Sequence, residues 1–377
     1  MTPGLGLGPG PGLGLVQTQR VVVADADDPL VLAGGASLSC VEVAFETYGE
    51  LSPPRDNAVV LCHALTGDAH AAGHHGDPSR PGWWDNLVGP GRAVDTDRFF
   101  VVCANLLGGC QGTTGPASTD PSTGRSYGLD FPLLHVGDLV AVHRRLARHL
   151  GIERWYAAVG GSLGGMQVLQ WATDAPEEIE RAVLVGASSR LSAQNIAFSA
   201  VARAAITGDP DFDGGRYVDT GRFPSHGLAT ARRLAHITYV SEQSLEVKFG
   251  RERLADGPPR HGTDFEVESY LDHQATTFLQ RFDALTYLYL SRVMDYFDPF
   301  ADPGAAARAG SGGTRFEVIS FDTDWRFPTA HSARIDAHLR SGGTRCRHTE
   351  LRSPWGHDSF LLDPPGYHER IAAFLAS

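Results

Sequence analysis

The chain has 377 residues, of which 42% are hydrophobic and 20% are charged, a composition typical of a globular protein. Its formal net charge of -12 argues against nucleic acid as a partner, because binding to phosphates requires a basic surface. No apolar run approaches the roughly 18 residues of a membrane-spanning helix, and the five scattered cysteines indicate no disulfide framework, so we expect a cytoplasmic protein that does not bind membranes.

The first stretch, MTPGLGLGPGPGLGLVQTQ, is rich in Gly, Leu and Pro. It contains no basic residue, and Gly and Pro interrupt its leucines, so it lacks both the charged start and the apolar run of a signal peptide. We therefore expect residues 1–19 to form a disordered tail ahead of a domain that begins at residue 20.

Short apolar runs and helical patterns alternate after this tail. Their order is typical of an α/β fold, with a mostly parallel central sheet and helices on both of its faces. Strands are predicted at 58–63, 98–108, 156–159 and 181–187, and helices at 138–152 and directly after Ser162.

The alternation stops after residue 190. Residues 191–311 carry helical patterns without strands. The Gly- and Ala-rich run DPGAAARAGSGG, which begins at Asp302 and extends to Gly313, is typical of a flexible linker. Strand and helix patterns then resume and continue to residue 377. We therefore predict one α/β core made of residues 20–190 and 312–377, interrupted by a helical lid insertion and linker over 191–311.

The run from Gly160 to Gly164 matches G-x-S-x-G between a predicted strand and a predicted helix. The glycines allow a tight turn that raises the Ser162 hydroxyl above the sheet edge, and the first N–H groups of the helix face the same point. We therefore expect Ser162 to be a nucleophile and the backbone N–H of Leu163 to stabilise an oxyanion. A structural glycine-rich turn without a catalytic role is the alternative.

A nucleophilic serine needs a base, and in this type of fold the acid and then the histidine follow the serine along the chain. The segment VISFDTD ends a predicted strand with Asp322 and Asp324, and SPWGHDSF places His357 in a loop before the last helix. We expect His357 to accept the serine proton and Asp324 to orient its imidazole. Asp322 is the alternative acid.

The segment CHALTGDAH follows an early strand, where a second oxyanion donor belongs, and we assign this role to the backbone N–H of Leu65. His70, His74 and His75 in and after this segment raise the possibility of a zinc site. No carboxylate or cysteine accompanies them at ligand spacing, and a serine nucleophile needs no metal. The sequence therefore predicts neither a metal nor a cofactor.

Longer blocks are more specific than any of these motifs. The chain resembles the homoserine O-acyltransferase family of the α/β-hydrolase superfamily from about residue 40 onward, in blocks that include LCHALTGDAH, VGGSLGGMQVLQWA, SAQNIAF, GLATARRLAHITY and RFDALTYLYLSRVMDYFD. The resemblance implies an α/β-hydrolase fold and the transfer of an acyl group from acyl-CoA to the hydroxyl of L-homoserine, in methionine biosynthesis. It also implies a cytoplasmic homodimer that is formed through the helical insertion.

The resemblance extends to individual residues. The three expected catalytic side chains fall on the catalytic triad of the family. Arg232 falls on the arginine that binds the homoserine carboxylate, which suits the forked guanidinium group. Tyr239 and Asp358 fall on positions that line the amino-acid site, and Asp358 is expected to accept the substrate ammonium. Two departures from the family pattern, Leu163 and Ser199, leave this assignment unchanged.

Arg326, in DWRFP, bears on the acyl donor. Members that use acetyl-CoA resemble DWLFP here, whereas users of succinyl-CoA carry arginine. A guanidinium can pair with the distal carboxylate of a succinyl group, and a bond of roughly 1.5–3 kcal/mol corresponds to a preference on the order of 10–100-fold. We therefore expect succinyl-CoA to be the co-substrate and the chain to be most similar to the succinyl-transferring members. Acetyl-CoA is the alternative donor.

Two further functions remain open at this point. An esterase or thioesterase could use the same serine, acid and histidine with water as the acceptor, although this alternative leaves the family blocks unexplained. A non-catalytic α/β-hydrolase that only binds a ligand is the second alternative, but such proteins usually lack part of the triad. In every case the expected partners are small molecules.

Overall fold

The computed structural model describes residues 12–377, and residues 1–11 of the expected tail lie outside the described residues. The central sheet has eight strands in the order β1-β4-β8-β5-β9-β10-β11-β12. These strands are β1 (Gln19–Ala24), β4 (Val41–Tyr48), β5 (Ala58–Cys62), β8 (Phe100–Ala104), β9 (Ala157–Gly161), β10 (Arg181–Val185), β11 (Arg315–Phe321) and β12 (Arg345–Leu351). Two small sheets pair β2 (Leu30–Val31) with β3 (Ser37–Leu38) and β6 (Val88–Gly89) with β7 (Val94–Asp95).

Strands β1 and β4 run antiparallel at one edge, and every neighbouring pair from β8 to β12 is parallel. The predicted mostly parallel sheet is therefore confirmed. Successive side chains of a strand point to opposite faces, so the apolar strands supply two cores. In β5, Val60 and Cys62 belong to one buried cluster, and Val59 and Leu61 belong to the other.

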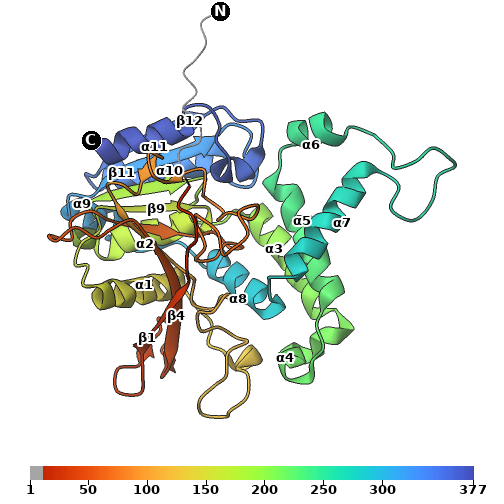
Figure 1. The fold of residues 1–377 in the computed structure, drawn as a ribbon, viewed down its shortest axis with the longest axis horizontal. Helices are drawn as coiled ribbons and strands as arrows, with labels where there is room; N and C mark the ends of the chain where they lie inside the picture. The colour runs from red at the N-terminus through yellow and green to blue at the C-terminus, as the bar shows by residue number, and fades with distance from the viewer. Residues whose placement is uncertain (1–11) are drawn as a thin grey trace, which may run out of the picture.

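Helices cover both faces of the sheet (Figure 1). Side chains of the first four helices named below lie in one core, and side chains of α11 lie in the other. These helices are α1 (Val136–Leu150), α2 (Leu163–Asp174), α9 (Ala305–Ser311), α10 (Thr329–Ser341) and α11 (Tyr367–Ala376). Within residues 12–377, no helix combines the length and the apolar character that crossing a membrane requires.

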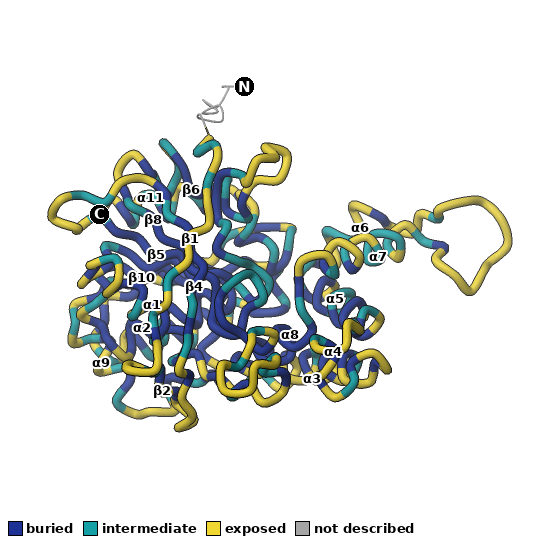
Figure 2. The backbone as a smooth tube through the Cα atoms, turned by 60° about the horizontal axis from the view of Figure 1, so that its bottom comes forward, coloured by how far each residue is buried: buried dark blue, intermediate teal, exposed yellow. Residues whose placement is uncertain are grey.

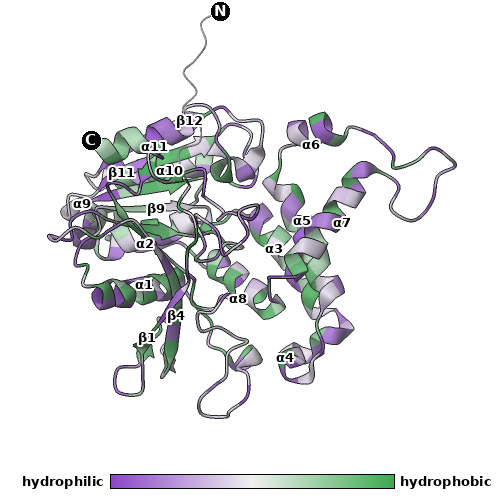
Figure 3. Ribbon diagram, in the orientation of Figure 1, coloured by the Kyte–Doolittle hydropathy of each residue, from purple (hydrophilic) through white to green (hydrophobic). Residues whose placement is uncertain are grey.

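The segment between β10 and β11 forms a second body beside the sheet, with α3 against α5 and α5 against α7 (Figure 1). Hydrophobic residues cover the central strands, whereas α5 and α7 mix both kinds (Figure 3). The connection between α6 and α7 protrudes and is largely exposed (Figure 2). The helices of this insertion are α3 (Ala193–Thr207), α4 (Tyr217–Thr220), α5 (Ser225–Tyr239), α6 (Glu242–Phe249), α7 (Glu266–Leu279) and α8 (Ala284–Asp295).

The structure corrects the expected extent of the N-terminal tail. Leu15 pairs with His74 in a parallel bridge, and the N–H of Val16 donates to the carbonyl of His74 over 3.0 Å. The hydroxyl of Thr18 donates to the Glu46 carboxylate over 2.8 Å. Residues 14–19 therefore contact the core. The backbone near Val16 and the side chain of Thr18 bind partners that lie far along the chain.

The predicted flexible linker is also wrong, because much of it is helix α9. Ala305 and Ala309 are 1% and 0% exposed, and the helix packs against α2 and α10. A Cβ added at Gly310 would overlap the carbonyl oxygen of Gly342. The small residues here serve close helix packing, which a composition rich in Gly and Ala does not distinguish from a linker.

Candidate active site

Ser162 stands on a sharp turn between β9 and α2. Its backbone has φ 56° and ψ -121°, a conformation that residues with a side chain adopt rarely and mostly at functional sites. The glycines around it are required by close backbone approach: a Cβ at Gly164 would overlap the carbonyl of Cys62, and a Cβ at Gly160 would overlap the backbone of Gly164. The run of glycines in the sequence thus allows a turn that projects one hydroxyl from the sheet edge.

Three side chains predicted from the sequence form one hydrogen-bonded chain. His357, in a 3₁₀ helix over Gly356–Leu361, has its Nε2 atom 2.9 Å from Ser162 Oγ and its Nδ1 atom 2.7 Å from Asp324 Oδ2. The rings of Phe327 and Phe360 pack against the imidazole with centroids 5.0 and 5.4 Å away. Ser162 is 8% exposed, and His357 and Asp324 are each 3% exposed. A proton can therefore pass from hydroxyl to imidazole in a site largely closed to water.

The two aspartates after β11 have different partners. Oδ1 of Asp324 accepts the N–H of Phe327 over 2.8 Å, which leaves its other oxygen for His357. Asp322 is exposed, and its Oδ1 accepts the N–H of Ser353 over 2.9 Å. Asp324 therefore occupies the position next to the imidazole, and Asp322 holds the loop between β12 and the 3₁₀ helix.

The two backbone N–H groups expected to bind an oxyanion are free. Across residues 12–377, neither Leu65 nor Leu163 donates its N–H to another protein group. Leu163 is the first residue of α2, where N–H groups lack partners within the helix and the helix dipole favours negative charge. Leu65 lies in the loop after β5 and lines the same cavity as Ser162.

This cavity, of about 360 Å³, lies between the sheet and the insertion. Ser162 and His357 line it from the sheet, and Arg232 and Tyr239, both on α5, line it from the insertion. Asp358 follows the histidine and lines it as well. The structure therefore brings together at one cavity residues that lie far apart in the chain, from Leu65 to Asp358.

Arg232 and Asp358 give the cavity its electrostatic character. Arg232 makes no ion pair within the described residues, its Nε atom is buried without a partner, and its Cζ atom lies 4.9 Å from the ring centroid of Phe278. Burial raises the pKa of Asp358 to about 6, and the positive charge of Arg232 nearby partly opposes this. The cavity thus offers an unpaired cation on the insertion side and, next to the catalytic histidine, a carboxylate that titrates close to neutral pH.

Comparison with known proteins agrees with this geometry. A family profile described as the alpha/beta hydrolase fold matches residues 57–364. A homoserine O-succinyltransferase from Nocardioides sp. is 66% identical over 361 residues, which is 96% of this chain and 98% of that protein. The chain belongs to the homoserine O-acyltransferase family of α/β hydrolases.

Solved structures show how widely this fold is shared. A homoserine O-acetyltransferase from Bacillus anthracis has a TM-score of 0.88 at 26% identity, over 96% of this chain and 98% of that one. The crystal structure of an esterase has a TM-score of 0.86 at 28% identity, over 96% of this chain and 100% of that one. The backbone alone therefore does not distinguish transfer to an amino acid from transfer to water.

Arg326 does not line the cavity but lies next to it. Its Cζ atom is 5.9 Å from the ring centroid of Tyr239, and its side chain reaches the hydroxyl of Thr238 over 3.4 Å. The residue is 6% exposed, and no carboxylate of the described chain pairs with it. A buried guanidinium without a counter-ion is unfavourable, so this position is suited to an anionic ligand group in this homoserine O-acyltransferase family member.

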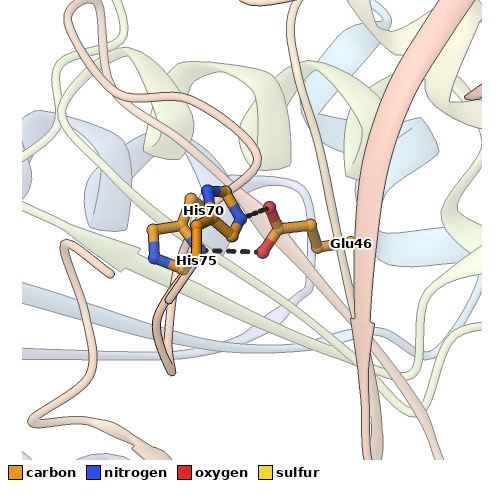
Figure 4. A group of neighbouring side chains, drawn as sticks. All are labelled: Glu46, His70 and His75. Atoms are coloured by element: carbon orange, nitrogen blue, oxygen red, sulfur yellow. Dashed lines mark hydrogen bonds and ion pairs between the residues drawn. The ribbon is translucent and has the colours of Figure 1, made fainter. Parts of the chain in front are cut away.

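The structure reveals a buried carboxylate that the sequence reading missed. Glu46 on β4 lies against His70 and His75, with its two oxygens 2.9 Å from His70 Nδ1 and 2.7 Å from His75 Nε2 (Figure 4). The expectation that no carboxylate accompanies these histidines is wrong, because Glu46 reaches them from 24 and 29 positions away. Its signal in the sequence is a charged residue within the apolar run VEVAFETY.

Hydrogen bonds account for this cluster. The hydroxyls of Thr18 and Tyr48 also donate to Glu46, so that four donors share its two oxygens. Burial alone would raise the pKa of Glu46, but these donors bring it below its usual value. The imidazoles of His70 and His75 lie against each other with centroids 3.8 Å apart and planes tilted by 32°, and each faces a different carboxylate oxygen. The cluster anchors His70, which lines the active-site cavity.

Proposed function

We propose that this protein transfers the succinyl group of succinyl-CoA to the hydroxyl of L-homoserine, giving O-succinyl-L-homoserine and CoA for methionine biosynthesis. The observation that carries the proposal is the hydrogen-bonded chain from Ser162 through His357 to Asp324, at a cavity whose opposite wall holds the unpaired Arg232. The relative from Nocardioides sp. that is 66% identical is a homoserine O-succinyltransferase, which supports the same activity.

In the first half-reaction, Ser162 Oγ attacks the thioester carbonyl carbon while His357 Nε2 accepts the hydroxyl proton. The carbonyl oxygen becomes an oxyanion, and the N–H groups of Leu65 and Leu163 donate to it. The carbon–sulfur bond then breaks, and the thiolate of CoA leaves with the proton held by His357. Asp324 keeps the imidazole in the orientation that both transfers need.

In the second half-reaction, homoserine replaces CoA in the cavity. Arg232 binds its carboxylate through two parallel hydrogen bonds, and Asp358 accepts its ammonium group. The homoserine hydroxyl gives its proton to His357 and attacks the ester carbon, and the proton returns to Ser162 as the ester bond to the serine breaks. The fixed position of the amino acid favours this transfer over hydrolysis.

Arg326 supports succinyl-CoA over acetyl-CoA as the donor. A buried guanidinium without a protein counter-ion stabilises a carboxylate at the end of the acyl chain, whereas a methyl group leaves it unpaired. Acetyl transfer is the second candidate, because the similar Bacillus anthracis structure is named a homoserine O-acetyltransferase. Both reactions use the same nucleophile and need no cofactor beyond the thioester.

The decisive experiment is to mix the protein with succinyl-CoA alone and to determine its mass. We expect one succinyl group on Ser162, release of one CoA, and no adduct on Ser162→Ala. Adding homoserine then removes the adduct. A protein that releases CoA at the same rate with and without homoserine is a thioesterase. The similar fold of an esterase is the reason for testing this alternative. A lack of any adduct overturns the covalent route.

We also propose a cytoplasmic homodimer that is formed through the helical insertion. Val247 on α6 is 83% exposed, and Leu254 in the segment after this helix is 47% exposed, which supports a contact at this end of the insertion. Light scattering on the purified protein is expected to give twice the mass of the chain. Val247→Asp should lower that mass if the contact involves α6.

A further inference from the structure

His63 is the last residue before the loop that carries Leu65. It follows β5 directly and is 1% exposed. Its ring has one hydrogen-bonding partner on each nitrogen: the N–H of Leu106 lies 3.1 Å from Nε2, and the carbonyl oxygen of Ala64 lies 2.8 Å from Nδ1. Neither the catalytic chain nor the substrate contacts described above use this residue.

The two partners define the state of the ring. An amide N–H can only donate, so Nε2 of His63 must accept from Leu106 and carries no proton. Burial lowers the pKa of His63, which keeps the ring neutral at neutral pH. Its single proton therefore lies on Nδ1, and the ring donates to the carbonyl of Ala64.

This bond acts on the peptide unit that joins Ala64 to Leu65. The unit is planar and trans, so its C=O and N–H groups point in opposite directions. The N–H of Gly67 also donates to the carbonyl of Ala64 over 3.0 Å, so His63 and Gly67 together fix this carbonyl and, with it, the N–H of Leu65 on the other side. That N–H has no partner within residues 12–377, and Leu65 lines the cavity with Ser162.

We propose that His63, as the neutral Nδ1–H tautomer, is a positioning residue that holds the Leu65 N–H in place for the oxyanion. The inference rests on the proposed acyl transfer and names the group that prepares its oxyanion site. Preorganised donors are effective because they need no rearrangement when charge develops. His63 acts through the backbone and contacts no reacting atom.

A buried amide ties this arrangement to the second donor. Gln167 on α2 donates through Nε2 to the carbonyl of His63 over 3.1 Å and to the carbonyl of Leu163 over 3.2 Å. Its Oε1 is 2.9 Å from Nε2 of His143, a ring whose pKa burial lowers to about 4. One amide group therefore links the loop after β5 to the start of α2. This link holds the segments that carry the two oxyanion donors in a fixed position relative to each other.

Two substitutions separate the two hydrogen bonds of the ring. In His63→Asn, the amide nitrogen lies near the position of Nδ1 and can still donate to Ala64. In His63→Gln, the amide oxygen lies near Nε2 and can still accept from Leu106, but the bond to Ala64 is lost. Removing an oxyanion donor costs about 10²–10³ in kcat, so we expect His63→Gln to lose roughly 100-fold and His63→Asn roughly 10-fold or less.

The measurements are single-turnover rates of acylation and deacylation, together with Tm. If His63→Gln displaces the oxyanion donor, acylation and deacylation slow by the same factor and KM for homoserine is unchanged. A general packing defect changes the two rates by different factors or changes KM. Equal losses in the two variants, or full activity of His63→Gln, overturn the proposal. The burst of p-nitrophenolate from p-nitrophenyl acetate is measured as well, because it needs the oxyanion site but not homoserine. A wild-type burst without homoserine transfer refutes the proposed function alone.

Gly67→Ala provides a second variant that keeps His63 itself. A Cβ at Gly67 would lie 3.0 Å from the His63 Cβ and 3.1 Å from its Nδ1, so the ring must shift by a few tenths of an ångström. We expect a loss of about 10-fold in both half-reactions, part of the effect of losing a donor. An unchanged rate in Gly67→Ala, combined with an unfolded His63→Gln, contradicts the proposal.

Discussion

The catalytic side chains and the two arginines near the cavity differ in how completely their polar atoms are satisfied. Both nitrogens of His357 and both oxygens of Asp324 have partners within 2.9 Å. Arg232 on α5 and Arg326 in the loop after β11 have no carboxylate partner within residues 12–377. The catalytic chain is thus complete without a ligand, whereas the two arginines carry positive charge without a counter-ion.

This difference separates chemistry from recognition. Groups that move protons and stabilise charge work best when they are already in place. A cation that must bind a substrate carboxylate cannot also be saturated by the protein, so its charge remains uncompensated until the ligand arrives. Substitutions in the catalytic chain should therefore lower kcat, and substitutions of the two arginines should change KM or donor choice.

The largest expected effect comes from Asp324→Asn. Loss of the carboxylate leaves the imidazole in the wrong tautomer, and the comparable change in a serine protease lowers kcat about 10⁴-fold. The matched control is Asp322→Asn, two residues away on the same turn, which should stay within about 3-fold of the wild type because surface changes have small effects. Steady-state CoA release measures both. Similar losses of kcat in the two variants would contradict the assignment of Asp324 alone as the acid of the triad.

Arg232→Met should act on the amino acid alone. Loss of a charge-assisted bidentate contact of about 3 kcal/mol raises KM for homoserine about 100-fold. Acylation by succinyl-CoA in the absence of homoserine should keep its rate. Arg233→Met is the control, since Arg233 is adjacent on α5 but is paired with Asp272 over 2.9 Å. A slower acylation step in Arg232→Met would place this residue on the donor side instead.

Arg326→Leu tests the donor. Removing a charged contact of about 2 kcal/mol should shift the ratio of kcat/KM for succinyl-CoA and acetyl-CoA about 30-fold toward acetyl-CoA. Side-by-side assays with both thioesters, at saturating homoserine, measure this ratio. An unchanged ratio would mean that Arg326 does not contribute to the choice between the succinyl and the acetyl donor.

The smallest effect is a pH dependence from Asp358, whose pKa burial raises to about 6. The carboxylate binds the homoserine ammonium only when ionised, and it gains a proton as the pH falls through this value. Below pH 6, kcat/KM for homoserine should fall by a factor approaching 10 for each pH unit. The ratio of wild type to Asp358→Asn isolates this effect, because every other group of the site is the same in both proteins. A ratio that is constant from pH 5 to pH 8 would contradict it.

The sequence predicted the features that depend on local order. The turn at Ser162, the parallel strands beside it and the places of Asp324 and His357 follow from glycine spacing, apolar runs and chain order. The sequence favoured Asp324 over Asp322 as the acid, and the fold gives the physical reason: both follow the same strand, but only Asp324 faces the imidazole.

Features that depend on distant partners were missed. Glu46 lies in an apolar strand pattern, and nothing near it in the sequence indicates that two histidines from a later loop bind it. Helix α9 was read as a linker because alanine and glycine can serve either flexibility or close packing, and only the neighbouring helices decide between them. The role of His63 likewise depends on Leu106, which belongs to another strand end.

The hydroxyl of Thr18 is one of the four donors to the buried Glu46 carboxylate, and this has a practical consequence for shortening the protein. A protein trimmed to begin at the first strand keeps every residue of the cavity, yet it lacks one hydrogen-bond donor to the Glu46 carboxylate, which is fully buried. The remaining three donors would have to redistribute around it, and His70 is the one that lines the active-site cavity. The chain ahead of the sheet is therefore part of the support of the cavity, and a trimmed protein should keep the residues from Gly14 onward that bond to the core.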